Sequence, residues 1–112
     1  MRLLAEAIAR AESTDERYCE AELHRLKGEL LRKHHRDAEA EQSFRTAIRI
    51  AQGQSAKSFQ LRATISLARL LAKHSHRDEA RSILADIYNW FTEGFDTADL
   101  KDAKALLEEL SA

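Results

Sequence analysis

The sequence predicts an all-α fold in which antiparallel helical hairpins stack side by side. Apolar residues recur at helical spacing along most of the 112-residue chain. There is no proline and there are only three glycines, so no stretch resembles a flexible linker. An order of small and large apolar side chains also repeats after forty residues, as stacked hairpins require. One domain that spans residues 1–112 is therefore expected.

The first predicted helix spans residues 2–12. Its apolar stripe comprises Leu4, Ile8 and Ala11. Because it has neither a cap nor a partner before it, we interpret it as the second helix of a partial repeat. Ser13 and Glu16 follow as a capping box, which predicts that a new helix begins there.

The segment 13–53 is predicted to form the first complete hairpin. Its first helix runs to about His34, with an apolar stripe of Cys19, Leu23, Leu26, Leu30 and Leu31. Gly28 in its middle costs about 1 kcal/mol relative to alanine, which indicates that a neighbouring backbone lies close. Asp37 is expected to cap the second helix, and Gly53 is expected to end it. The inward side chains of that helix are Ala40, Phe44, Ala47, Ile48 and Ala51.

The segment 55–92 is predicted to form the second hairpin, and residues 97–111 a capping helix. Ser55 is expected to cap a helix that carries Leu61, Ile65, Ala68, Leu71 and Ala72. After a turn at residues 74–77, a helix from Asp78 presents Ala80, Ile83, Leu84, Ile87 and Phe91, until Glu93 and Gly94 break it. Thr97 is expected to cap the last helix, whose stripe is Leu100, Ala103, Leu107 and Leu110.

The forty-residue repeat supports these assignments. It superposes Gly28 on Ala68, Leu31 on Leu71, Ala40 on Ala80, Phe44 on Leu84 and Ala47 on Ile87. This order resembles the tetratricopeptide repeat (TPR) family, whose period is about 34 residues. The resemblance implies a right-handed α-α superhelix with a concave binding face.

Four phrases carry a second resemblance: AELHRLKGELL, AEAEQSFRTAIRIA, LRATISLARLL and YNWFTEGFDTADLKDAKALLEEL. They are similar to the carboxy-terminal helical repeats of large bacterial signalling proteins. Those proteins join an adenylate or guanylate cyclase domain, or a winged-helix DNA-binding domain, to an ATPase domain and a helical tail. The resemblance implies a regulatory tail. Because no cyclase or ATPase motif stands in this sequence, those activities are not expected of it.

Charge and cysteine content narrow the class of partner. Eighteen basic and nineteen acidic residues give a formal charge of -1, which disfavours wholesale binding to nucleic acid or to an anionic membrane. The lone Cys19 cannot form an internal disulfide, and an inert buried thiol is expected. Neither a signal peptide nor a membrane-spanning run is evident, so we expect a cytoplasmic protein.

If the first helix of each hairpin lines the concave wall, as the resemblance implies, that wall is basic. Its cations form the candidate peptide-binding face: Arg25, Arg32, Lys33, Arg62, Arg69 and Lys73. Glu22 and Glu29 are the acids beside them. Arginine suits carboxylates, so an acidic peptide is the expected ligand. The alternative is a solvated face with salt bridges along it, such as Arg25 with Glu29.

Other candidate sites have plainer interpretations. His34, His35, His74 and His76 fall in two turns on one expected edge, but without a standard ligand spacing they predict at most weak metal binding. Trp90, Phe91 and Phe95 either pack the end cap or form an exposed anchor. Neither a phosphate-binding loop nor a recognisable nucleophile is present, and Glu108 and Glu109 point in different directions, so no enzyme activity or cofactor is expected.

Three functional hypotheses follow. The first is a non-catalytic scaffold that binds a protein or peptide. The second is the tail of a cyclase or an ATPase-type transcriptional regulator, whose activity would belong to the parent protein. A nucleic-acid accessory is disfavoured by the near-neutral charge. The uncovered stripe of residues 2–12 further predicts a homodimer through that end.

Overall fold

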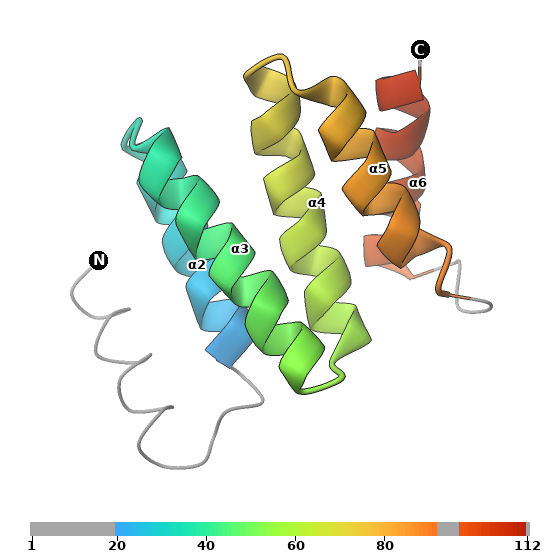
Figure 1. Ribbon diagram of the computed structural model, residues 1–112, viewed down its shortest axis with the longest axis horizontal. Helices are drawn as coiled ribbons and strands as arrows, with labels where there is room; N and C mark the ends of the chain where they lie inside the picture. Colours follow the sequence, from blue (N-terminus) through green and yellow to red (C-terminus); the bar gives the residue numbers. More distant parts are fainter. Residues whose placement is uncertain (1–19, 92–96, 112) are drawn as a thin grey trace.

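The computed structural model describes residues 20–91 and 97–111, which form five α-helices and no strand (Figure 1). The helices are α2 (Glu20–Lys33), α3 (Asp37–Gly53), α4 (Lys57–Lys73), α5 (Arg77–Tyr88) and α6 (Ala98–Ser111). The predicted all-α fold is confirmed. The helix expected at residues 2–12, the capping box at Ser13 and Glu16, and Cys19 lie outside the described residues.

One turn geometry connects α2 to α3, α3 to α4 and α4 to α5. In each turn one residue adopts a left-handed backbone: His35, Ser55 and Ser75 have φ values of 61°, 54° and 67°. The N–H of that residue donates to the carbonyl three residues earlier, at 3.0–3.2 Å, and the next N–H donates to the carbonyl five residues before it, at 2.8–2.9 Å. These paired bonds are the Schellman motif. Because the three turns are twenty residues apart, α3, α4 and α5 begin at residues 37, 57 and 77.

The Schellman turns explain why two predicted N-caps are wrong. The residues before α3 and α4 are Arg36 and Ala56, and neither forms a side-chain cap hydrogen bond. Asp37 is instead the first residue of α3, while Ser55 is the left-handed residue that closes the turn. Gly53 is the last residue of α3, so the helix end predicted there is confirmed. The turn that closes one helix leads directly into the next, so no capping side chain stands between them.

The cap predicted at Thr97 is confirmed. The N–H of Leu100 donates to Thr97 Oγ1 at 3.4 Å, and the N–H of Lys101 donates to the Thr97 carbonyl at 3.0 Å. On α6 the buried residues are Leu100, Ala103, Leu106 and Leu110, whereas Leu107, expected in the stripe, is half-buried.

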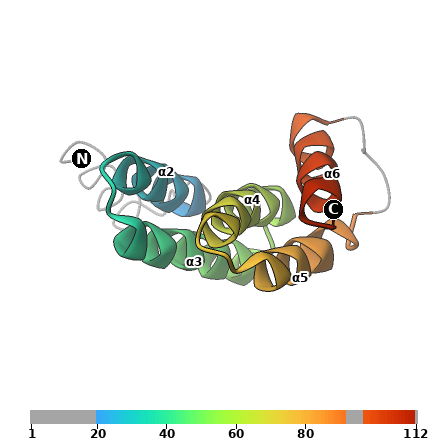
Figure 2. The same ribbon diagram turned by 90° about the horizontal axis from the view of Figure 1, so that it is seen from above.

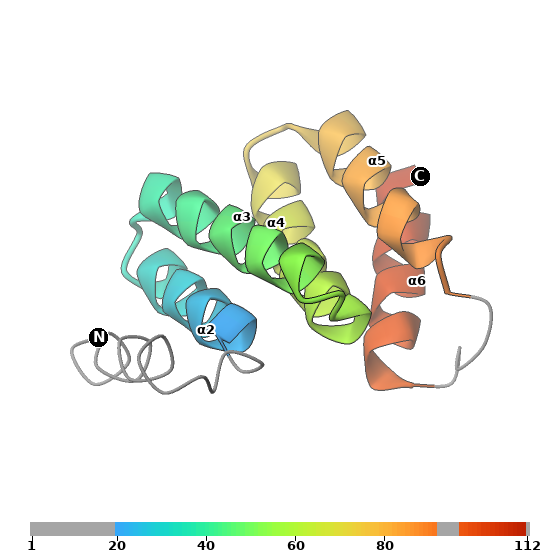
Figure 3. The same cartoon turned by 60° about the horizontal axis from the view of Figure 1, so that its bottom comes forward.

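The helices form two layers. Figure 2 shows α2, α4 and α6 in one layer and α3 and α5 in the other. Each helix packs against the next along the chain, and α4 also packs against α2 and α6. Among the described residues the backbones of α3 and α5 do not pack together, although the side chains of Arg45 on α3 and Glu79 on α5 form an ion pair. Figure 3 shows α6 alongside α5 at the end of the row. The stack therefore lies closed on the α2, α4 and α6 side and open between α3 and α5.

The core is built mainly around α4, which is buried on most of its circumference. Its largest fully buried side chains are Leu61, Leu67 and Leu70, and the other layer adds Phe44 and Leu84. The small side chains of Ala40, Ala68 and Ala80 are completely buried in the same cluster. The helices therefore meet at short distance where these alanines lie.

Gly28 has a different neighbour from the one predicted. A Cβ atom at this position would lie 2.5 Å from Cε1 and 2.6 Å from Cδ1 of Phe44, so a side chain and not a backbone approaches it. The buried face of α2 consists of Glu20, Ala21, Gly28 and Leu31. Leu26 of the predicted stripe is 40% exposed. The ring of Phe44 determines which face of α2 is buried, because the ring occupies the space beside Gly28.

The helix α5 ends earlier than predicted, at Tyr88. Phe91 lies beyond it, packs against the core, and lines a hollow together with Leu61 and Leu100. The chain has to leave the axis of α5 for this side chain to reach the space between α4 and α6. Glu93, Gly94 and Phe95 lie outside the described residues.

Candidate peptide-binding surfaces

Four of the six predicted cations meet in one hollow between α2 and α4. Arg25 and Arg32 come from α2, while Arg69 and Lys73 come from α4. The hollow has a volume of about 310 Å³ and is completed by Glu29, Ser66 and Leu70. We call it the α2–α4 surface. Arg62 and Lys33 do not line it.

Most of these cations already have carboxylate partners. The pairs are Arg25 with Glu22, Arg32 with Glu29 at 3.2 Å, Arg62 with Glu22 and with Asp99 at 3.0 Å, Arg69 with Asp102 at 2.9 Å, and Lys73 with Asp37 at 3.1 Å. Lys33 is exposed at the end of α2. The expected pair of Arg25 with Glu29 is wrong, because each glutamate pairs with the arginine three residues after it. An acidic ligand would therefore compete with internal carboxylates.

Arg62 joins three helices of one layer. Its guanidinium donates to Glu22 on α2 and to Asp99 on α6, and these carboxylates raise its pKa. Partial burial alone would raise the pKa of Glu22, but hydrogen bonds from Arg25 and Arg62 outweigh this effect and lower it. Arg62 thus fastens the layer together, and its charge is balanced within the fold.

Asp37 links the α2–α3 turn to the end of α4. Its Oδ2 accepts hydrogen bonds from His74 Nε2 at 2.8 Å and from Lys73 Nζ at 3.1 Å. These two bonds, that of His74 first, hold the pKa of Asp37 below its ordinary value. The two turns therefore lie on the same edge of the stack, as the sequence predicted.

The histidine turns form no evident metal site in the described part of the chain. His34, His35 and His76 are exposed, and His74 is engaged by Asp37. No three histidine, cysteine, aspartate or glutamate side chains gather there in a way that could hold a metal ion.

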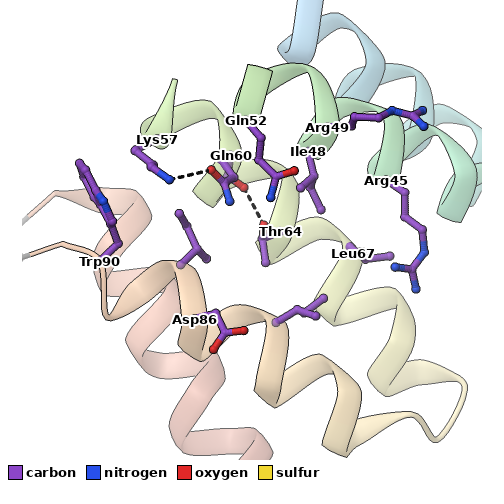
Figure 4. A pocket seen from close by; sticks show the side chains of 12 residues that line it. Arg45, Ile48, Arg49, Gln52, Lys57, Gln60, Thr64, Leu67, Asp86 and Trp90 are labelled. Atoms are coloured by element: carbon purple, nitrogen blue, oxygen red, sulfur yellow. Dashed lines mark hydrogen bonds between the residues drawn. The ribbon is translucent and has the colours of Figure 1, made fainter. Parts of the chain in front are cut away.

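A second hollow, of about 350 Å³, lies between α3 and α5 over α4. We call it the α3–α5 groove, and Figure 4 shows it with Trp90 and Lys57 at one end and Arg45 at the other. Its apolar lining comprises Ile48, Leu67, Ile83 and Ile87. Its polar lining comprises Arg45, Arg49, Gln52, Lys57, Gln60, Thr64 and Asp86. This groove was not predicted from the sequence, in which the exposed-anchor alternative for Trp90 was the signal that pointed toward it.

The cations of the α3–α5 groove differ in their partners. Arg45 pairs with Glu79 and with Glu41, each at 3.0 Å, and these carboxylates raise its pKa. Arg49 donates only to the hydroxyl of Thr46, at 3.3 Å. Lys57 lies 5.2 Å from the centroid of the Trp90 ring. Within residues 20–91 and 97–111 neither Arg49 nor Lys57 forms an ion pair, so this groove keeps uncompensated positive charge.

Trp90 is exposed at the rim of this groove. Its side chain is 56% exposed and meets the ring of Phe91 edge to face, with 5.2 Å between the ring centroids. Phe91 packs against the core, as the end-cap interpretation predicts, and Phe95 lies outside the described residues. The exposed-anchor alternative fits Trp90.

No protein-family model, curated protein or solved structure matches this chain. Within the described residues, no helix has both the length and the apolar character needed to cross a bilayer.

Proposed function

We propose that this chain is a non-catalytic interaction module that binds an acidic protein segment or peptide on the α2–α4 surface. One observation carries the proposal: four cationic side chains from two helices line a single hollow in which Glu29 is the one acidic lining residue. Arginine forks bind carboxylates in a bidentate manner, and a helix-held surface does so without ordering a loop.

The existing ion pair of Arg69 does not prevent such binding. The side chains of Arg69 and Asp102 are 54% and 50% exposed, and exposed pairs contribute only about 0–1 kcal/mol each. A ligand carboxylate can therefore replace an internal partner at small cost. The internal acids also favour ligands with several carboxylates over ligands with one.

Charge reversal provides the test. The probe is a fluorescein-labelled decapeptide that alternates glutamate with alanine, and its binding is followed by fluorescence anisotropy. Arg69→Glu is expected to weaken binding about ten-fold, because it replaces attraction by repulsion in the hollow. Arg81→Glu is the matched control, since Arg81 is exposed on α5 and lines neither hollow. Equal affinities of the two variants would contradict the proposal.

We further propose that the module is a TPR-like repeat with a right-handed superhelical twist and a closing helix. The forty-residue spacing of the hairpins supports this, and so does the polar outer face of α6. That face comprises Lys101, Lys104, Glu108 and Glu109, all of which are exposed. Terminal helices with a polar outer face are typical of the ends of repeat arrays.

The cellular context is proposed from the sequence resemblance. We propose a cytoplasmic regulatory tail of a bacterial signalling protein, in which any cyclase or ATPase activity belongs to the parent. A gene that encodes nucleotide-binding motifs in frame with this segment would support the proposal. A homodimer through residues 2–12 is proposed as well, and sedimentation that shows a monomer at high concentration would contradict it.

A further inference from the structure

The α3–α5 groove lies in the layer opposite the α2–α4 surface, and it has the features of a second binding site. It exists because α3 and α5 both pack on α4 while their backbones stay apart, with the Arg45–Glu79 ion pair spanning the space between them. Its volume of about 350 Å³ falls at the lower end of the range for ligand sites, about 300–1,000 Å³. An occupant would thus be of the size of one or two side chains.

The floor of the groove is suited to an aliphatic side chain. Ile48 and Ile83 are half-buried and face it from opposite walls, and Ile87 continues the apolar lining along α5. A side chain that entered here would cover partly exposed isoleucine surface and would be held by the hydrophobic effect. A purely polar ligand would leave this surface uncovered.

The rim of the groove is suited to carboxylates. Arg49 and Lys57 have no carboxylate partner among the described residues, and Asp86 is the one acid in the lining. The amide of Gln60 is 8% exposed, and its Oε1 lies 3.5 Å from Lys57 Nζ, which directs the ammonium over the groove (Figure 4). Complementary charge therefore favours an anionic ligand.

Trp90 adds an aromatic anchor at the same end. A tryptophan that is 56% exposed leaves a large apolar surface in water, and tryptophan is among the residues most enriched in binding hot spots. The ammonium of Lys57 lies 5.2 Å from its ring centroid, so the aromatic and cationic groups act at one place.

We propose that the α3–α5 groove binds an acidic segment of a protein partner that inserts a leucine-like side chain over Ile48 and Ile83 and places flanking carboxylates on Arg49 and Lys57. This site does not depend on the α2–α4 surface. It differs in requiring an apolar anchor between the acidic residues. One partner segment could occupy each layer independently.

The test uses the intrinsic fluorescence of Trp90, the chain's one tryptophan. Three decapeptide probes are compared: leucine alternating with glutamate, leucine alternating with lysine, and serine alternating with glutamate. We expect the leucine–glutamate peptide to shift the emission to shorter wavelength saturably, and the other two to bind at least about ten-fold more weakly.

Two charge reversals then locate the site. Lys57→Glu is expected to weaken the leucine–glutamate peptide about ten-fold. The variant should fold, because an acidic residue is favourable in the first turn of α4. Arg81→Glu is the matched control, because Arg81 lines neither hollow, and it should leave the emission shift of Trp90 unchanged. Circular dichroism establishes that both variants are folded.

Each other outcome overturns the inference. If Arg69→Glu abolishes binding of the peptide and Lys57→Glu does not, the peptide binds the α2–α4 surface. That result would support the proposed function and contradict a second site in the α3–α5 groove. If the serine–glutamate peptide binds as tightly as the leucine–glutamate peptide, the site does not require an apolar anchor. If anionic phosphatidylglycerol vesicles shift the emission of Trp90 and none of the peptides does, the groove binds a lipid surface and not a protein segment.

Discussion

The ring of Phe44 occupies the space that a side chain on Gly28 would need. Phe44 is fully buried, and a Cβ atom on Gly28 would lie 2.5 Å from its Cε1 atom. Glycine lowers helix stability, so its presence in the middle of α2 has a packing reason. This contact is what lets α2 lie close against α3, and the α2–α4 surface depends on the position of α2.

Gly28→Ala is therefore predicted to destabilise the protein by about 1–3 kcal/mol, because overpacking outweighs the gain in helix propensity. Urea denaturation followed by circular dichroism measures the change. Phe44→Leu provides the second corner of a double-mutant cycle. If the ring causes the cost, the double variant should be less destabilised than the sum of the two single variants. Additive effects would show that the contact is not responsible.

Gly53→Ala is predicted to have the opposite sign. Gly53 is the last residue of α3, and no atom would lie within 4 Å of a Cβ added there. Alanine should stabilise the protein by about 0.5–1 kcal/mol, through higher helix propensity and a less flexible unfolded chain. The same denaturation experiment reports it. A loss of stability would mean that Gly53 is needed for the turn itself.

Ser75→Gly is predicted to stabilise the α4–α5 turn. Ser75 has a φ of 67°, in the left-handed region that costs a residue with a Cβ atom about 1–2 kcal/mol. Glycine removes that strain but adds freedom to the unfolded chain, so the expected net gain is about 0.5–1 kcal/mol. Thermal unfolding measures it. Ser75→Ala is the control and should give no gain, because alanine keeps the Cβ atom.

The link at Asp37 predicts a dependence of stability on acidic pH. The pKa of Asp37 in the folded chain is lowered by His74 and Lys73, whereas in the unfolded chain it is about 3.9. Its stabilising contribution is therefore present above about pH 4 and is lost as the pH falls through the folded value. Asp37→Asn should reduce the fall in unfolding free energy between about pH 5 and pH 2.

Asp78→Asn is the matched control for this pH experiment. The side chain of Asp78 is 99% exposed and lies 3.5 Å from Arg81 in the first turn of α5. Removing the charge of Asp78 should leave the unfolding free energy as dependent on pH as it is in the original chain. If the unfolding free energy of Asp37→Asn depends on pH as strongly as that of the original chain, the hydrogen bonds of Asp37 with His74 and Lys73 contribute nothing to stability.

The sequence allowed the order of the helices and most of the core to be predicted, because these depend on local periodicity. The forty-residue shift paired Gly28 with Ala68 and Phe44 with Leu84, and all four are buried. The left-handed turns were missed because histidine and serine occupy the position where glycine is usual.

The candidate sites were harder to predict because they depend on contacts between distant residues. Arg62 lies forty residues from Glu22 and 37 from Asp99, so no local spacing reveals that its charge is balanced. The α3–α5 groove depends on two helices whose backbones do not pack together, and predicting it requires knowledge of how both pack on α4. Charge counts along one helix face therefore overestimated the free positive charge of the α2–α4 surface.

Binding of an acidic peptide to the α2–α4 surface is tested most directly by a nuclear magnetic resonance titration of the nitrogen-15-labelled chain with the glutamate–alanine decapeptide. If the protein works by presenting the α2–α4 surface, saturable shifts of backbone amide signals should fall in residues 25–33 and 66–73. Arg69→Glu should raise the peptide concentration that gives half of the maximal shift about ten-fold. Shifts that are absent, or that spread evenly over all five described helices, would contradict a preformed surface that recognises acidic segments.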